Sequence, residues 1–181
     1  MTASRLPLPA CLALLVLAVA PVDQARAGCS DPAGPEVDWV RCYLHGRDLG
    51  GGDLSGARRR DARFIRANLA AANLAGADGF RSKFVSARMV GAKLDAARLT
   101  SSDLTKADLS DASLVGTDLR RAKLVRAILS DADLSDAKLR GADLTDADLS
   151  GALWTDGKTR CAPGSVGQCN TVARRDDDGS S

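Results

Sequence analysis

The chain has 181 residues, with 25 Lys and Arg, 23 Asp and Glu, a single His and 3% aromatic residues. Its net charge is +2, and removal of Arg5, Arg26 and Asp23 with the N-terminal segment described below leaves +1. Such a balance argues against a nucleic-acid groove and against a strongly acidic mimic of DNA. The chain contains no P-loop, serine-hydrolase or zinc-protease motif. We therefore expect a protein that is not an enzyme and needs no cofactor, metal or small-molecule substrate.

Residues 1–27 are predicted to be a secretory signal peptide. Arg5 precedes an apolar run over residues 10–20, which is too short to span a bilayer permanently. The sequence over residues 25–27, Ala-Arg-Ala, is typical of a signal-peptidase site. Cleavage near Ala27 would give a periplasmic or secreted protein with no transmembrane segment. A buried N-terminal helix is the alternative. We expect no lipid anchor at Cys29, because the apolar run ends well upstream of it.

Residues 28–43 come before the repeats and are predicted to cap the N-terminal end of the fold. Repeat folds need such caps, because an open end would expose apolar side chains and unpaired backbone groups. We expect Trp39 to lie over the first coil as a lid.

The stretch that organises the chain has a unit of five residues and is regular from Leu49 to Trp154. Steps of five from Leu49 reach 22 positions, and 16 of them are Leu. The other large apolar residues in the series are Phe64, Phe84, Met89 and Trp154. Only Arg59 and Gly79 break it, and Ala stands two residues earlier in 17 of the 22 units.

A period of five fits neither a helix nor a straight strand. On a helix each Leu would lie about 140° from the last, and on a strand successive Leu would point to opposite faces. The chain must instead turn a corner in every unit, so that each Ala and Leu points inward. Four corners close one coil, and 22 units give about 5.5 coils in a rod roughly 26 Å long at strand spacing.

Most of the predicted core is a column of leucines along the axis of this rod. These residues are Leu69, Leu74, Leu94, Leu99, Leu104, Leu109, Leu114, Leu119, Leu124, Leu129, Leu134, Leu139, Leu144 and Leu149. An inward Arg59 would be costly without a partner, so we expect the chain to bulge outward there. Phe64 and Phe84 are expected to fill part of the space left by Gly79.

The run Ala-(Asp/Asn/Lys/Arg)-Leu-x-x resembles the pentapeptide-repeat proteins over about 110 residues. The resemblance implies an all-β fold, the right-handed quadrilateral β-helix, here over residues 44–156. One group of this family protects against quinolones by mimicking DNA and binding DNA gyrase, a topoisomerase, in the cytoplasm. The signal peptide and the mixed charge of this chain argue against that function, which we keep as the alternative.

One surface row is predicted to be a partner-binding face. Residues twenty apart share a vertical column, and one column is β-branched, as in a flat sheet surface. It consists of Ile65, Val85, Thr105, Val125 and Thr145, flanked by Arg66, Lys106 and Arg126. The alternative is ordinary β-propensity on a solvated face. We expect the chain to be a structural or protein-interaction scaffold whose partner is another protein or the cell envelope, with no nucleic acid bound.

After the repeats, residues 157–172 are predicted to form a stapled loop, and residues 173–181 a disordered tail. The four cysteines of the exported chain indicate two disulfides; the spacing of a zinc site is absent. A stiff rod would keep its two ends apart. The predicted pairs are therefore Cys29 with Cys42 and Cys161 with Cys169.

Overall fold

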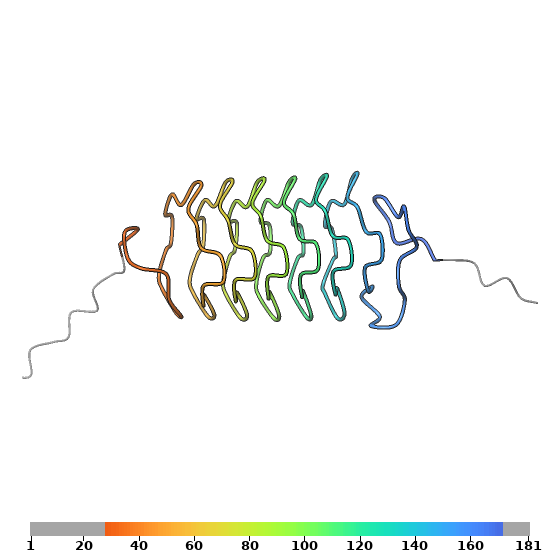
Figure 1. The fold of residues 1–181 in the computed structure, drawn as a ribbon, viewed down its shortest axis with the longest axis horizontal. Coiled ribbons are helices and arrows are strands. Elements are labelled where there is room, and N and C mark those ends of the chain that lie inside the picture. Colours follow the sequence, from red (N-terminus) through yellow and green to blue (C-terminus); the bar gives the residue numbers. More distant parts are fainter. Residues whose placement is uncertain (1–27, 172–181) are drawn as a thin grey trace, which may run out of the picture.

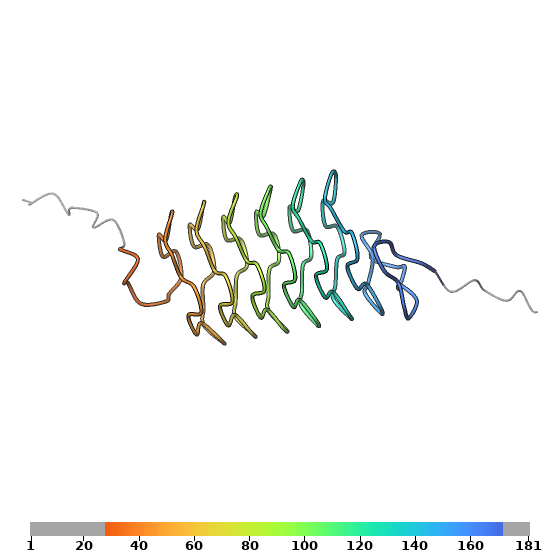
Figure 2. The ribbon, with the colours of Figure 1, turned by 90° about the horizontal axis from the view of Figure 1, so that it is seen from above.

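The computed structural model describes residues 28–171, which form a straight rod of stacked coils (Figures 1 and 2). The predicted signal peptide and the predicted tail lie outside the described residues. The chain enters at one end of the rod and leaves at the other, and each coil stacks on the one before it in both views. Residues that are close in space are therefore either close in sequence or one coil apart.

One coil takes twenty residues. Parallel β-bridges join each outward residue to the residue twenty positions later, from the pair Asp38–Arg58 to the pair Asp133–Leu153. Bridge positions recur every five residues from Asp38 to Leu153, which makes 24 units and six coils. Within residues 28–171 there is no helix, and every extended segment is reduced to a single bridge residue. Such short segments arise because the chain turns again after each inward Leu.

The unit around Leu109 shows how the backbone is satisfied. The N–H groups of Leu109 and Asp111 donate to Ile128 and Ser130 of the next coil, at 2.7 and 3.0 Å. The N–H of Ala112 closes the corner by donating to the carbonyl of Leu109 at 3.1 Å. Asp111 lies in the left-handed region with a φ of 58°. Sixteen non-glycine residues have positive φ, all at this position of the turn. The corner thus has the backbone of a type II-like turn and is imposed by the coil rather than by glycine.

The core consists of the inward Ala and Leu positions. Twelve of the fourteen predicted leucines are buried, whereas Leu139 and Leu144 in the last coil are half-buried. Phe64 and Phe84 occupy the inward column next to that of Arg59, Gly79 and Leu99. Their rings stack with centroids 5.0 Å apart and planes 4° from parallel. The edge of Phe84 lies 3.7 Å from the position that a Cβ on Gly79 would take, and Leu99 would lie only 2.7 Å from it. Leu99 and Phe84 therefore occupy the space that Gly79 leaves.

The expected bulge at Arg59 is wrong, because the coil is regular there. The N–H of Arg59 donates to the carbonyl of Asp78 at 2.7 Å, as Leu54 and Phe64 do to the equivalent residues of the next coil, and the side chain points inward with 1% exposure. Its Nη2 donates to the carbonyl oxygen of Leu54, and its guanidinium lies 6.0 Å from the centre of the Phe64 ring. These contacts, together with the absent side chain at Gly79, let the coil hold a buried cation.

The regular coil begins earlier than the predicted boundary at residue 44. Trp39 is not a lid: it takes the Leu position in the first unit of the first coil, is fully buried, and its neighbour Asp38 bridges to Arg58. The series that starts at Leu49 omits the units of Trp39 and Leu44, in which Val37 and Cys42 stand at the position of Ala. The remaining N-terminal residues are tied to this coil by the Cys29–Cys42 disulfide, whose Cα atoms are 5.3 Å apart.

The C-terminal end is closed by a return of the chain. Residues after Trp154 run back antiparallel to the last coil, with the bridges Leu153–Arg160 and Asp148–Val166. The Cys161–Cys169 disulfide holds this segment, with Cα atoms 4.9 Å apart. Both pairings are those expected from the sequence, and they lie at opposite ends of the rod.

Candidate interaction surface

The predicted β-branched row does form a vertical column on the outside of the rod, because the register is twenty residues throughout. Four members, Ile65, Val85, Thr105 and Val125, are half-buried, and Thr145 is exposed. The flanking cations Arg66, Lys106 and Arg126 are exposed on the adjacent turn positions. The row therefore offers little free apolar surface, and its charged border is the more accessible feature.

The four corners of the coil differ in charge. The corner that begins at residues 40 and 41 carries six Arg and one Asp, and we name it the basic corner. Its cations are Arg41, Arg60, Arg81, Arg120, Arg121 and Arg140. The next corner, beginning at 45 and 46, carries three cations and one Asp; the last two carry five Asp and no Lys or Arg. A net charge near zero thus conceals a rod with one basic side.

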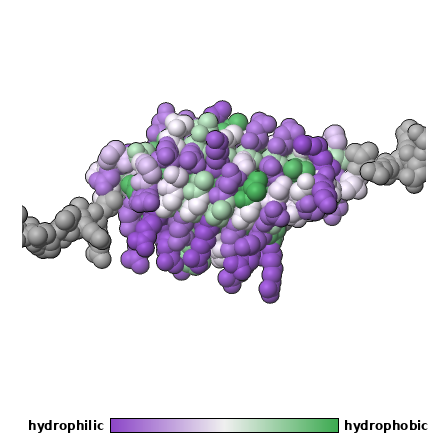
Figure 3. All heavy atoms as spheres, turned by 90° about the horizontal axis from the view of Figure 1, so that it is seen from below, coloured by the Kyte–Doolittle hydropathy of each residue, from purple (hydrophilic) through white to green (hydrophobic). Residues whose placement is uncertain are grey.

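Hollows lie along this basic corner. Four of them are lined together by ten Arg and Lys side chains but only three Asp. The largest has a volume of about 590 Å³, and we name it the basic groove. It is lined by Asp61, Arg63, Arg81, Lys83, Ser101, Ser102, Asp103, Arg121 and Lys123. The space-filling view shows long hydrophilic side chains projecting in a row along one edge of the rod (Figure 3).

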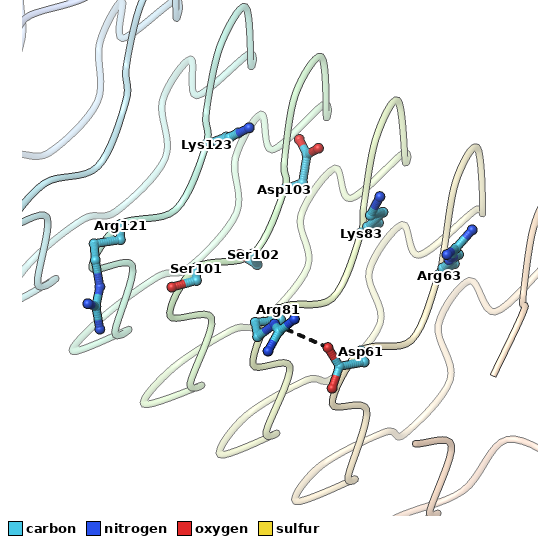
Figure 4. Close-up of a pocket in the computed structure, with 9 residues that line it drawn as sticks. All are labelled: Asp61, Arg63, Arg81, Lys83, Ser101, Ser102, Asp103, Arg121 and Lys123. Atoms are coloured by element: carbon cyan, nitrogen blue, oxygen red, sulfur yellow. Dashed lines mark ion pairs between the residues drawn. The ribbon is translucent and has the colours of Figure 1, made fainter. Parts of the chain in front are cut away.

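The basic groove runs between two rows of side chains (Figure 4). Arg121, Ser101, Arg81 and Asp61 follow the corner, and Lys123, Asp103, Lys83 and Arg63 follow the neighbouring face. Only one ion pair joins the two kinds of charge inside it, from Arg81 Nε to Asp61 Oδ1 at 3.4 Å. For Lys83, Arg121 and Lys123 the described part of the chain provides no ion pair within 4.0 Å. These three cations are therefore available to a ligand.

Two aromatic rings lie near the groove, Tyr43 in a neighbouring hollow and Phe80 on the basic corner, and guanidinium groups lie over both. The Arg63 guanidinium lies 4.7 Å from the centre of the Tyr43 ring. Phe80 has three such neighbours, Arg60, Arg98 and Arg81, at 5.2, 5.5 and 5.9 Å. These cation–π contacts hold the long arginine side chains in place along the corner.

Further along the basic corner, Arg120 forms a two-pronged ion pair with Asp118. Its Nε and Nη2 donate to the two carboxylate oxygens at 2.9 and 2.7 Å. These hydrogen bonds are the main reason why the pKa of Asp118 is lowered to about 2. The pair neutralises Arg120 locally, whereas Arg121 and Arg140 in the adjoining hollow have no ion pair with any residue of 28–171.

Residues 28–171 contain no group of three His, Cys, Asp or Glu side chains arranged to hold a metal ion. Over the same stretch no helix is long and apolar enough to cross a bilayer.

Comparison with known proteins agrees with the coil. A family described as pentapeptide repeats matches in eight copies over residues 60–95, 92–131 and 127–152, which together span 93 of the 181 residues. The chain belongs to the pentapeptide-repeat family. A search of curated proteins gave no match.

Several solved structures are similar to this pentapeptide-repeat protein. Rfr23 from the cyanobacterium Cyanothece 51142 is 23% identical, with a TM-score of 0.53 over 65% of this chain and 90% of that one. HetL from Nostoc sp. strain PCC 7120, involved in heterocyst differentiation regulation, is 32% identical over 68% of each chain, with a TM-score of 0.29. Full-length QnrB1, a plasmid-mediated fluoroquinolone resistance protein, is 18% identical over 67% of this chain and 76% of that one, with a TM-score of 0.35.

The sequence analysis missed the basic corner of this pentapeptide-repeat protein. The information was present, because the turn residues also recur in columns of twenty. The prediction from the sequence rested on the net charge of the whole chain, which averages the four corners. It assigned a partner surface to the β-branched row, which borders the same basic face from its other side.

Proposed function

We propose that this protein is an exported, non-enzymatic scaffold that binds a partner protein through the basic side of its rod. The observation that carries the proposal is the sorting of charge by corner, with nine cations on two adjacent corners and none on the other two. A rigid coil repeats each outward position at a fixed spacing, so a column of side chains can bind an extended stretch of a partner. Export is supported by the N-terminal sequence and by two disulfides, which are typical of oxidising compartments. We also propose that the coil is right-handed, as the family resemblance implies.

Two measurements test this proposal. Cell fractionation with N-terminal sequencing should find the mature protein outside the cytoplasm and beginning at Gly28. A photo-crosslinking residue at Ser101, in the basic groove, should capture one defined partner, and the same residue at Ser130, on a corner without cations, should not. Cytoplasmic protein that retains residues 1–27 would contradict export, and equal capture from the two positions would contradict the scaffold surface.

The alternative is binding of a topoisomerase by mimicry of DNA. It has one supporting observation, which is that five Asp and no cation occupy the other two corners. A gyrase supercoiling assay distinguishes the two functions. Inhibition that is lost on replacing Asp111 and Asp131 by Asn would favour the alternative.

A further inference from the structure

We propose that the basic groove binds an extended acidic segment of a polypeptide. The inference rests on the proposed function, because the segment would belong to the partner protein, and it specifies the chemistry of that partner. The charge of the groove, its shape and the state of its neighbours each bear on the nature of the ligand.

Four of the five cations in the groove form two clusters along the rod axis, and the fifth, Arg63, lies one coil before Lys83 with its guanidinium over the Tyr43 ring. Arg81 and Lys83 lie on one coil, and Arg121 and Lys123 lie two coils further on. Two coils correspond to roughly 10 Å at strand spacing, a length that about three residues of extended polypeptide cover. Each cluster contains an Arg, which can hold a carboxylate with two hydrogen bonds, and a Lys, which acts as a point charge; at Arg81 a ligand carboxylate would compete with Asp61. Carboxylates about three residues apart would therefore reach both clusters.

Small polar groups lie between the two clusters. Ser101 is half-buried, and Ser102 is 1% exposed with a hydroxyl that has no hydrogen-bond partner among the described residues. One coil earlier, the equivalent Ser82 donates to the carbonyl oxygen of Arg59. Ser102 is inward and its hydroxyl is buried, so the half-buried Ser101 is the serine of the groove whose hydroxyl can meet a polypeptide backbone, which supplies both donors and acceptors.

Other polyanions fit the groove less well. Single-stranded nucleic acid needs free aromatic faces on which its bases stack, whereas Tyr43 and Phe80 are already covered by guanidinium groups. An anionic membrane presents a uniform sheet of charge, which Asp61 and Asp103 inside the groove would oppose. In a polypeptide these positions could face neutral or basic residues, so the mixed charge of the groove becomes a source of specificity.

The test is a binding titration with the purified protein and a fluorescent peptide of ten glutamates, followed by fluorescence anisotropy at low salt. The groove variant replaces Arg81 and Arg121 by Glu. The matched control replaces Arg88 and Lys93 by Glu, which changes the net charge equally at exposed bridge positions away from the two basic corners. The groove variant also removes the exposed Arg81–Asp61 ion pair of 3.4 Å.

We expect the wild-type protein to bind the peptide, and binding to weaken as salt shortens the Debye length from about 10 Å at 0.1 M to 3 Å at 1 M. The groove variant should lose at least about tenfold in affinity, and the control less than about threefold. Comparable losses in the two variants would mean that overall charge, and not the groove, binds the peptide, and would overturn the proposal.

Two further outcomes would also overturn it: no binding of the peptide at low salt, or tighter binding of a ten-nucleotide oligothymidine or of phosphatidylglycerol vesicles. This titration needs neither export nor a cellular partner. Failure of the acidic-peptide proposal is thus distinguishable from failure of the scaffold function, which fractionation and crosslinking test separately.

Discussion

Asp and Asn are common before the inward residue because they complete the hydrogen bonding of the unit. In the unit around Leu109, backbone groups accept four of the five N–H donors, and the N–H of Ser110 remains. The carboxylate of Asp108 accepts it at 3.2 Å. Asn68 plays the same part for Ala70, also at 3.2 Å. The polar residue of the repeat is therefore a local cap on the corner and not only a solubilising charge.

A first prediction follows for this unit. Leu109→Asp places an unpaired charge on the axis and should destabilise the fold by more than about 4 kcal/mol, enough to unfold or split the rod. Asp108→Ala should cost about 1 kcal/mol, because one N–H loses its acceptor at a solvated corner. Asp108→Asn keeps the acceptor and should be near neutral. Urea unfolding of the three variants measures this order, and equal effects of Leu109→Asp and Asp108→Ala would contradict the inward and outward assignments.

Arg59 is a buried cation without a carboxylate partner among the described residues. Burial lowers its pKa to about 9, because the charged form loses its hydration. Its Nε has no hydrogen-bond partner among the described residues, while Nη2 donates to Leu54. That carbonyl also receives the N–H of Ala57 at 3.4 Å, so it keeps a donor if Arg59 is replaced.

Accordingly, Arg59→Met should stabilise the protein by about 1 to 4 kcal/mol, as expected when a buried charge is replaced by an apolar side chain of similar length. Arg58→Met is the control: this neighbour points outward and makes one weak ion pair of 4.0 Å. Its effect should lie within about 1 kcal/mol of zero. Urea unfolding gives both values. A loss of stability in Arg59→Met would show that the guanidinium contacts outweigh the cost of burying it.

The next prediction concerns the pKa of Asp118 and its cause. Its folded pKa of about 2 lies below the ordinary value of 3.8, so the pair with Arg120 stabilises the fold above pH 4 and is lost as the pH falls toward 2. Carboxyl chemical shifts in NMR should titrate near pH 2 in the wild type and move toward 3.8 in Arg120→Ala. Asp156 is the internal control, because its pKa of about 2 depends mainly on the Thr159 hydroxyl. An unmoved Asp118 midpoint in Arg120→Ala would exclude Arg120 as the cause.

At the scale of the repeat, the five-residue period is enough to predict the coil. It specifies which residues point inward and the register of twenty, because only a corner in every unit can bury all the leucines. The period says less where a unit departs from it. At Arg59 the cost of burial suggested a bulge, but the contacts that offset this cost come from Leu54 and Phe64, one unit away. Trp39 and Val37 follow the period with unusual residues, so the start of the coil was placed too late.

Predicting the basic groove requires more than the five-residue period. Its position follows from sorting the turn residues by twenty, which the sequence permits. Its availability does not follow, since it depends on which cations already have partners. Arg81 and Arg120 are paired, and Lys83 and Arg121 have no ion pair among the described residues. Side-chain geometry decides this, and repeat spacing alone carries no information about it.

Over the whole molecule, each coil contacts only the coils before and after it, and stability is therefore local along the rod. A coil in the middle of the rod has bridges to a coil on each side, whereas the coils at the two ends do not. In the last coil, residues 137–146 have bridges on one side only within the described chain, at Lys138 and Asp143. Leu139 and Leu144 are correspondingly half-buried. The return segment covers the remaining part of that coil through Asp148 and Leu153. Fraying should therefore begin at the ends, and at the C-terminal end from the uncovered half.

The last prediction uses hydrogen exchange to locate the effect of each disulfide. In the chain-entropy account, closing loops with sequence separations of 13 and 8 residues stabilises the fold by about 2.5 to 3 kcal/mol each. Cys161→Ser with Cys169→Ser should speed exchange at Leu149 and Gly151, whose N–H groups donate to Ser165 and Cys161 of the return segment at 2.8 and 3.0 Å. Amides near Leu94 and Leu104 should keep their protection, because more than two coils of twenty residues separate them from Leu149. Cys29→Ser with Cys42→Ser is the matched variant, and it should loosen the first coil alone. Uniform loss of protection in either variant would mean that the six coils unfold as one cooperative unit, so that the staples act on the whole rod and not on its ends.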